Sequence, residues 1–390
     1  MQARIKPAYL AALAAFVATA ALSRLHATPY NNFVLLAQAF LHGHAWIDWP
    51  GNYIDALRYT DGRYYVIEAP LPAVLLLPVV AIFGGQTNQT LLSVILVSVG
   101  IGAAWELGER FGLPWQRNVW ICAFLLAGTD LLWCAMLGDV WFIAHVCAVA
   151  FTLLALLEAF GKKRGWLVAL WAVCALESRF TMALAIPVYA WLICEPGSTI
   201  LPRLRRARIL AFCGVLLVAG ILWAGYNEAR WGTLTDIGYT MWYHADSAGS
   251  PIGSPFQIRY LTYQLESFFI SAPHFTRAFP YVVPDFGGIA LTWTSPALLL
   301  AFAARRPKQL AIAMWIATAL TAIPNLLYYV NGYAQFGMRH ALDFEPFLFV
   351  LMALAAQRGV PAWGRVLIAY SVLVGLWGCA YWNHFVRPLY

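Results

Sequence analysis

Charged side chains are scarce in this sequence, which excludes a soluble globular protein. Only 11% of the 390 residues are Asp, Glu, Lys or Arg, whereas 62% are hydrophobic and the mean hydropathy is +0.67. Soluble domains carry roughly 25% charged residues. Lys and Arg outnumber Asp and Glu by 25 to 18. In a membrane protein this excess belongs in cytoplasmic loops, so we predict a lipid bilayer as partner and no nucleic acid.

Closely spaced cysteine pairs are also missing. A disulfide framework or a zinc site would place such pairs in polar loops, whereas every cysteine here lies in an apolar run. The seven are Cys122, Cys134, Cys147, Cys174, Cys194, Cys213 and Cys379. We interpret them as packing residues. Because no spacing of His, Asp or Glu indicates a metal site either, we predict no metal and no cofactor.

Long apolar runs are abundant. A helix needs about 20 apolar residues to cross the hydrocarbon core, and the sequence predicts an all-α bundle of about eleven spans in one domain, residues 1–390. We expect spans near residues 8–25, 89–108, 118–137, 141–160, 209–226, 287–303, 309–327 and 363–380, with shorter ones at 166–178, 181–194 and 344–357. Asp130 lies inside one span and should face protein or water, because an ionised carboxylate facing lipid is costly.

Whether the run from Leu71 to Phe83 crosses the membrane determines on which side all later loops lie. It has only 13 residues, including two prolines, and we interpret it as re-entrant or interfacial. The basic clusters at residues 162–164, 203–208 and 305–308 are then cytoplasmic, as the positive-inside rule requires. The amino terminus lies inside and the carboxyl terminus outside. Outer loops are expected at residues 26–88, 227–286 and 328–346.

The first outer loop groups carboxylates with aromatic side chains. It begins with a predicted helix from Asn31 to Gly43, whose apolar stripe should lie along the membrane surface. The stripe is Phe33, Leu36, Ala37, Phe40 and Leu41. Asp48, Asp55, Asp61 and Glu68 follow, interleaved with tryptophan and tyrosine. This grouping at a membrane face indicates a site, although Trp and Tyr also populate membrane interfaces routinely.

Several short motifs resemble those of the GT-C superfamily of polytopic glycosyltransferases, especially the protein O-mannosyltransferase and lipid A aminoarabinose transferase branch. They are the helix Asn31–Gly43, Glu68-Ala69-Pro70, Leu137-Gly138-Asp139-Val140, Ala175-Leu176-Glu177-Ser178-Arg179, and Gly337-Met338-Arg339-His340 with Asp343-Phe344-Glu345-Pro346. The resemblance implies a GT-C-type bundle in the bacterial inner (plasma) membrane. It also implies a polyprenyl-phosphate-linked sugar as donor and an active site on the outer face.

The candidate catalytic base follows from one departure from this family. An acidic residue stands at the head of the family's juxtamembrane helix, where this chain has Asn31 and Asn32, and asparagine cannot accept a proton near neutral pH. Glu68 matches the family motif and becomes the leading candidate, with a structural ion pair as the alternative. Asp55 and Asp61 are weaker candidates, because Asp61-Gly62 is also an ordinary turn signal.

Arginines are the candidate ligands of the donor phosphate, since a guanidinium group binds two phosphate oxygens at once. Arg339 and Arg179 match family positions, with His340 and Arg58 in reserve; pairing with Glu177 or snorkelling would equally explain Arg179. We expect Glu68, Arg179 and Arg339 to face one cavity. Its other predicted lining residues are Tyr64, Tyr65, Asp139, His145, Asn31 and Asn32. Asp139 could instead cap a helix, and His145 could be a packing residue.

Three functions stay open at this point. The first is transfer of a hexosyl or pentosyl group from a polyprenyl-phosphate carrier to an outer-face lipid, glycan or protein. The second is a lipid-linked sugar transporter or flippase, which should show polar residues on both faces, whereas the acidic residues here gather on the outer one. The third is a non-catalytic relative that binds a glycolipid or a partner, which Asn31 and Asn32 favour.

Overall fold

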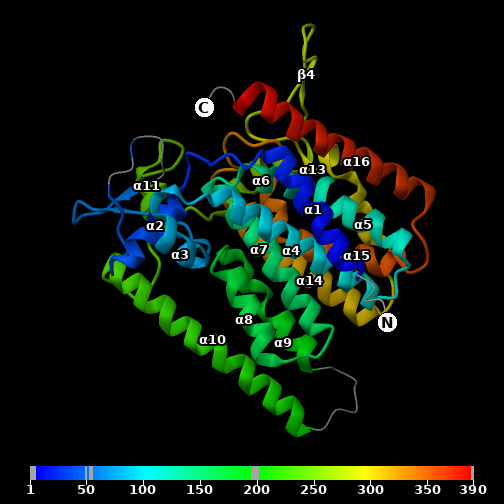
Figure 1. Ribbon diagram of the computed structural model, residues 1–390, viewed down its shortest axis with the longest axis horizontal. Coiled ribbons are helices and arrows are strands. Elements are labelled where there is room, and N and C mark those ends of the chain that lie inside the picture. Colours follow the sequence, from blue (N-terminus) through cyan, green and yellow to red (C-terminus); the bar gives the residue numbers. More distant parts are fainter. Residues whose placement is uncertain (1–5, 49–50, 52–55, 195–201, 388–390) are drawn as a thin grey trace.

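The protein is a bundle of helices with two very short strand pairs, as the sequence predicts (Figure 1). The computed structural model describes the chain except for residues 1–5, 49–50, 52–55, 195–201 and 388–390. The α-helices are α1 Pro7–Ser23, α2 Asn32–Leu41, α3 Leu71–Phe83, α4 Gln89–Arg110, α5 Trp115–Ala127, α6 Leu131–Leu137, α7 Val140–Ala159, α8 Gly165–Leu176, α9 Ile186–Cys194, α10 Pro202–Trp231, α11 Gly238–Ala245, α12 Leu261–Phe269, α13 Leu291–Thr294, α14 Lys308–Leu327, α15 Glu345–Ala356 and α16 Ala362–Tyr381.

Shorter elements complete the chain. The antiparallel strand pairs are β1 Leu57–Arg58 with β2 Tyr64–Tyr65, and β3 His274–Phe275 with β4 Val282–Val283. The 3₁₀ helices include η2 Phe180–Ala185, η4 Pro296–Ala303 and η5 Arg339–Asp343, and the π-helix η6 Trp382–Val386 continues α16. The seven cysteines are all free, as the sequence predicts.

Within the described residues, five helices are long and apolar enough to cross a membrane, or six if α5 and α6 count as one broken span. They are α4, α7, α10, α14 and the continuous segment Ala362–Val386. The other predicted spans correspond to shorter apolar segments: α1, α8, η2 with α9, and α15. The axes of α5 and α6 differ by 51°. Asp130 lies at this break and is 6% exposed, so its side chain faces protein as expected.

One predicted span is wrong. Residues 287–303 do not form a continuous helix but comprise the four-residue helix α13 and the 3₁₀ helix η4. The cause is local, because Ser295 has a non-helical backbone (φ −133°, ψ 44°) and Pro296 has no N–H to donate. The long outer loop also begins later than predicted, since α10 continues through Asn227 to Trp231.

Helix α3 has the predicted bounds, whereas α2 is shorter than the predicted segment from Asn31 to Gly43 and most of its apolar stripe packs against protein. Helix α2 ends at Leu41, and Gly43 follows with φ +81°. Phe33, Leu36 and Ala37 are fully buried in a cluster with residues of α3 and α7. The stripe therefore holds the first outer loop onto the bundle.

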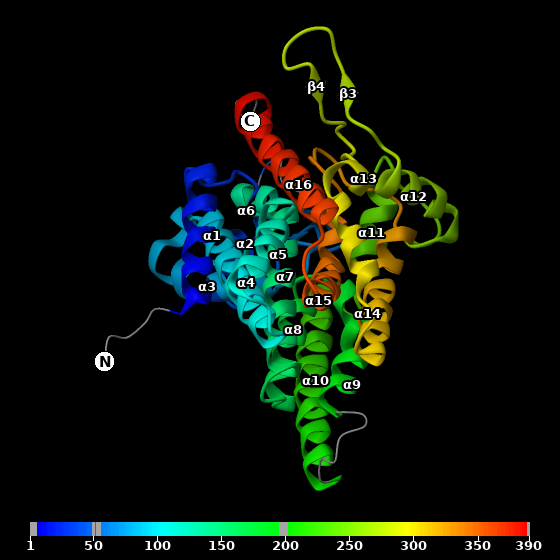
Figure 2. The same cartoon turned by 90° about the vertical axis from the view of Figure 1, so that its right-hand side faces the viewer.

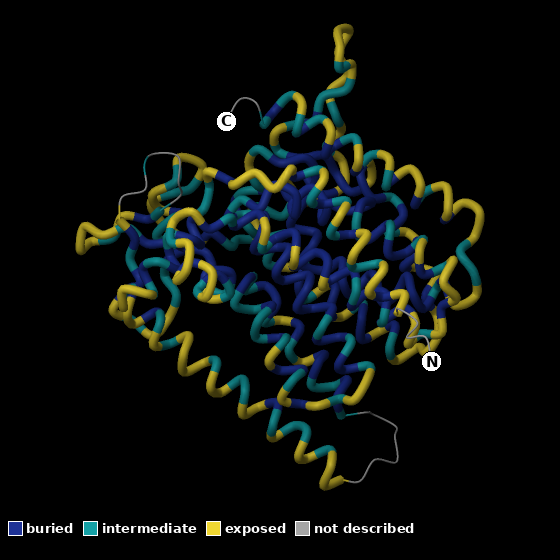
Figure 3. Tube along the Cα trace, in the orientation of Figure 1, coloured by how far each residue is buried: buried dark blue, intermediate teal, exposed yellow. Residues whose placement is uncertain are grey.

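Two elements mark the ends of the molecule. Helix α10 extends beyond the bundle at one end, and the hairpin of β3 and β4 projects from the opposite end (Figures 1 and 2). Helix α10 is the most peripheral span, with 6% of its most apolar stretch buried, whereas α7 is central, with 83% buried (Figure 3). The arginine cluster that starts α10 and the long outer loop thus lie at opposite ends, as the predicted topology requires.

Gly375 lies where α16 packs tightly against the carboxyl end of α5, and a substitution there tests how these two helices pack. A Cβ atom at Gly375 would overlap the carbonyl oxygen of Ala127, which is backbone and cannot rotate away. Gly375→Leu should therefore destabilise the protein by about 1–3 kcal/mol or more. Gly214→Leu in α10, where a Cβ meets no atom within 4 Å, should leave the thermal midpoint in detergent unchanged. Equal midpoints for the two variants would contradict this packing.

Candidate functional site

A cluster of hydrogen-bonded polar side chains surrounds Asp343 inside the bundle. The Asp343 carboxylate accepts bonds from Arg179 Nη2 at 3.0 Å, His145 Nδ1 at 2.9 Å, Thr181 Oγ1 at 2.8 Å and Asn325 Nδ2 at 2.9 Å. These groups come from α7, the turn after α8, η2 and α14, and η5 carries Asp343 itself. The carboxylate thus joins elements that are distant in the sequence.

Arg179 and Asp343 form a buried ion pair, with side-chain exposures of 12% and 0%. Burial alone would raise the pKa of Asp343, but the charge of Arg179 and the interactions with His145 together outweigh burial, and the pKa lies well below its ordinary value. Arg179 therefore pairs with Asp343, and not with Glu177, the partner considered from the sequence. Its charge is neutralised inside the protein.

His340 adds a fixed donor next to this pair. Arg179 Nη2 lies 3.2 Å from His340 Nδ1, and a guanidinium group can only donate, so Nδ1 accepts. Burial lowers the pKa of His340 well below its usual value, and the charges of Arg339 and Arg179 lower it further. The ring is therefore neutral and its proton sits on Nε2. Within the described part of the chain, that N–H has no hydrogen-bond partner.

The first of two cavities, called the inner cavity, has a volume of about 540 Å³ and brings together some of the predicted catalytic and phosphate-binding residues. Glu68, Arg179 and Arg339 all line it, as do His145 and His340. The amide of Leu71 donates to the carbonyl of Glu177 at 2.9 Å, which ties the start of α3 to the turn that carries Arg179. This contact places Glu68, 8% exposed, on the same side of the bundle as the Arg179 pair.

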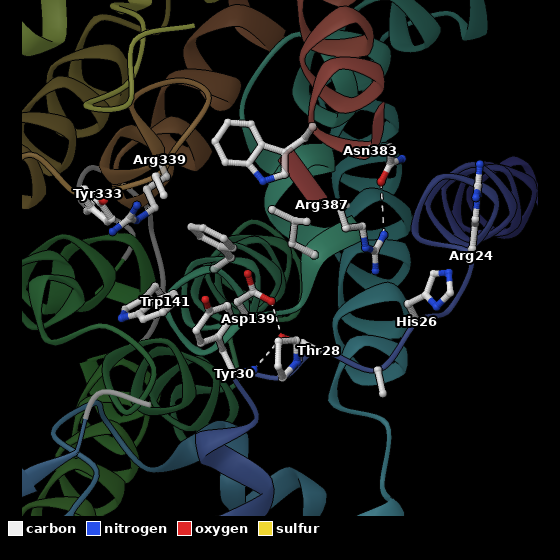
Figure 4. A pocket seen from close by; sticks show the side chains of 16 residues that line it. Arg24, His26, Thr28, Tyr30, Asp139, Trp141, Tyr333, Arg339, Asn383 and Arg387 are labelled. Carbon is white, nitrogen blue, oxygen red and sulfur yellow. Dashed lines mark hydrogen bonds between the residues drawn. The ribbon is translucent and has the colours of Figure 1, made fainter. Parts of the chain in front are cut away.

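The second cavity, called the basic cavity, has a volume of about 870 Å³ (Figure 4). Arg24, Arg387 and Arg339 line it together with Asp139, whose carboxylate accepts a short hydrogen bond from Thr28. Three residues line both cavities: Trp141, Tyr333 and Arg339.

Arg339 lines both cavities, and not all of its guanidinium N–H groups are used in hydrogen bonds within the described residues. Its Nη1 donates to Gln335 Oε1 at 2.7 Å, and the guanidinium lies 5.2 Å from the centre of the Phe142 ring. The side chain is 7% exposed, and its Nε–H has no partner among the described residues. Such a group can bind an anion without breaking an existing ion pair.

Several predicted site residues lie elsewhere. Tyr64 and Tyr65 line neither of these cavities, because they pair with β1 and Tyr65 packs on Trp231. Asp61 forms the turn expected as its alternative, accepting from the Arg63 amide and the Tyr65 hydroxyl. Arg58 is exposed on β1. Asn31 and Asn32 stand at the start of α2 and line neither cavity, although the preceding Tyr30 lines the basic one, and Asp55 lies outside the described residues.

Sequence reasoning missed other lining residues. Asn325, Tyr239, Tyr328 and Asp246 line the inner cavity, and Tyr329, also lining it, donates a short hydrogen bond to Asp246. Only Asn325 carried a signal, as an amide inside an apolar span. The tyrosines and Asp246 lie far from the motifs in sequence, and no local pattern distinguishes them from interfacial residues.

Comparisons with known proteins support the fold. A scan of protein-family models and a search of curated sequences both find no match. The structure is similar to the crystal structure of ArnT from Cupriavidus metallidurans bound to undecaprenyl phosphate, with a TM-score of 0.57 and 15% sequence identity. The match covers 93% of this chain and 62% of that one, so the chain spans less than two thirds of ArnT. The predicted all-α helical fold is confirmed, and it is similar to the fold of ArnT.

Proposed function

We propose that the protein is a membrane glycosyltransferase that takes a sugar from a polyprenyl-phosphate carrier and transfers it to an acceptor on the outer face. One observation carries the proposal. A carboxylate, Glu68, and a cation without an ion-pair partner in the described residues, Arg339, line the same cavity. A carboxylate that accepts the acceptor's proton and a cation that stabilises the leaving phosphate would both accelerate such a transfer. The similarity of the fold to a structure that holds undecaprenyl phosphate supports this proposal.

The chemistry assigns a role to each group. An acceptor hydroxyl attacks the anomeric carbon, the bond from that carbon to the phosphate oxygen breaks, and the carrier leaves as polyprenyl phosphate. Glu68 takes the proton from the hydroxyl as general base. Arg339 stabilises the negative charge that develops on the departing phosphate. His340, with its Nε2–H in the same cavity, is placed to donate to a sugar or phosphate oxygen.

Mass spectrometry of surface glycans tests the proposal in the cells that make the protein. Deleting the gene should remove one glycosyl group from a surface lipid, glycan or protein. The unaltered gene should restore this group, and a gene encoding Glu68→Gln should not. If glycans stay unchanged in the deletion, the transferase proposal fails and the non-catalytic reading takes its place.

A further inference from the structure

The positive charge available to an anion lies mainly in the basic cavity. Arg24 and Arg387 line it with Arg339, and no ion pair of these three arginines occurs among the described residues. Among the described residues of its lining, Asp139 is the one carboxylate, and it accepts a hydrogen bond from Thr28. The inner cavity differs, because Arg179 is neutralised by Asp343 and two carboxyl groups, those of Glu68 and Asp246, also line it. An anion is therefore favoured on the basic side.

The two ends of the chain hold Arg387 in place. Its Nη1 donates to the carbonyl of Ser23 at 3.1 Å and to Asn383 Oδ1 at 3.2 Å, while Asn383 Nδ2 donates to the carbonyl of Leu22 at 2.9 Å. The carboxyl end of α1 thereby anchors η6 and leaves the remaining guanidinium N–H groups of Arg387 for a ligand. Figure 4 shows Arg387 and Arg24 on one side of the cavity, with Arg339 and Tyr333 across from them.

The backbone after α1 takes an uncommon shape at this site. Arg24 and Leu25 both have φ of 51°, a left-handed conformation that costs a non-glycine residue roughly 1–2 kcal/mol. Such residues cluster where a ligand is held. The turn directs the chain from α1 to Thr28 along the cavity, and it leaves the Arg24 side chain exposed at the rim.

We propose that the basic cavity binds the phosphate of a lipid, with Arg24 and Arg387 holding its oxygens and Arg339 facing them from across the cavity (Figure 4). This inference deepens the proposed function and rests on it for the identity of the lipid. Leu137, Phe142 and Trp382 line the cavity and offer apolar surface to the first carbons of the chain. The sugar-bearing end then points past Arg339 toward Glu68. Arg387, and not Arg179, supplies the second phosphate-binding arginine.

A binding titration tests this site without requiring turnover. The full chain in phosphatidylcholine nanodiscs is titrated with farnesyl phosphate, phosphatidic acid or inorganic phosphate, and Kd is measured by isothermal titration calorimetry. Losing one charge-assisted contact should weaken farnesyl phosphate binding about tenfold or more in Arg387→Gln and in Arg24→Gln. Arg365→Gln removes the same charge from an exposed position near the start of α16 that lines neither cavity, and it should leave Kd unchanged.

Each outcome decides one point. Unchanged farnesyl phosphate binding in both variants overturns the site, and Arg24→Gln decides alone if Arg387→Gln does not fold. If inorganic phosphate and farnesyl phosphate bind with equal affinity, the lipid chain contributes nothing to binding, and the ligand is not a lipid. Tighter binding of phosphatidic acid, lost in the same variants, keeps the phosphate site but identifies a phospholipid as its ligand. If binding depends on the arginines but no glycosyl transfer is found, the phosphate site stands and the proposed function fails. If both variants transfer the sugar with an unchanged KM, the proposed function stands and the phosphate site fails.

Discussion

Glu68→Gln is expected to lower the rate of glycosyl transfer by about 10²-fold or more without changing the amount of folded protein. Glutamine keeps the size of the side chain and its hydrogen bonding, but it cannot accept the proton of an acceptor hydroxyl. Because Glu68 is 8% exposed and lines the inner cavity, its loss as a base would not be replaced by bulk water. Turnover is measured as release of polyprenyl phosphate by the purified protein.

The matched control for this prediction is Glu228→Gln. Glu228 lies near the carboxyl end of α10, is exposed and lines neither cavity, and its change to glutamine is chemically the same. Its activity should equal that of the unaltered protein. Full activity of Glu68→Gln would remove Glu68 as the base. Asp246, which also lines the inner cavity, Asp55 or a base-free reaction would then remain.

Asp343→Ala is expected to cost about 3–5 kcal/mol of stability, because it leaves the Arg179 guanidinium buried without its counterion. The variant also removes the acceptor for His145, Thr181 and Asn325. Thermal unfolding in detergent, followed by intrinsic tryptophan fluorescence, should show a large fall in the midpoint or no folded protein.

A surface ion pair provides the comparison for Asp343. Asp285 pairs with His274 at 2.8 Å, but the two side chains are 42% and 64% exposed. Exposed pairs contribute about 0–1 kcal/mol, so Asp285→Ala should barely move the midpoint. Adding Arg179→Met to Asp343→Ala should recover part of the loss, since it removes the uncompensated charge. Equal effects of Asp343→Ala and Asp285→Ala would show that the buried pair is not a structural centre of the bundle.

Local patterns were sufficient to predict most helices but not how they are joined. The bounds of α3 follow from its apolar run, and Gly43 ends α2 near the predicted position. The predicted span at 287–303 fails because composition records how apolar a run is and not whether its backbone stays helical through Ser295 and Pro296. The stripe of α2 faces protein, since its apolar neighbours come from segments distant in sequence.

At the site, too, the sequence predicted local features but not the contacts between distant segments. The sequence predicted that Glu68, Arg179 and Arg339 would face one cavity, and the structure brings them together there. It could not reveal that Asp343, 164 positions from Arg179, neutralises that arginine. Nor could it indicate Arg387, whose role depends on contacts between the two ends of the chain. Charge balance at a site depends on tertiary contacts that motifs do not contain.

The proposed function requires that a polyprenyl-linked sugar reacts in the cavity lined by Glu68 and Arg339. Incubating the purified protein in nanodiscs with a panel of polyprenyl-phosphate sugars and a cell-envelope lipid extract tests this requirement directly, with released polyprenyl phosphate measured by mass spectrometry. We expect saturable release with at least one donor, which is lost in Glu68→Gln and retained in Glu228→Gln. No release with any donor, from protein that still binds farnesyl phosphate, would contradict the proposed function.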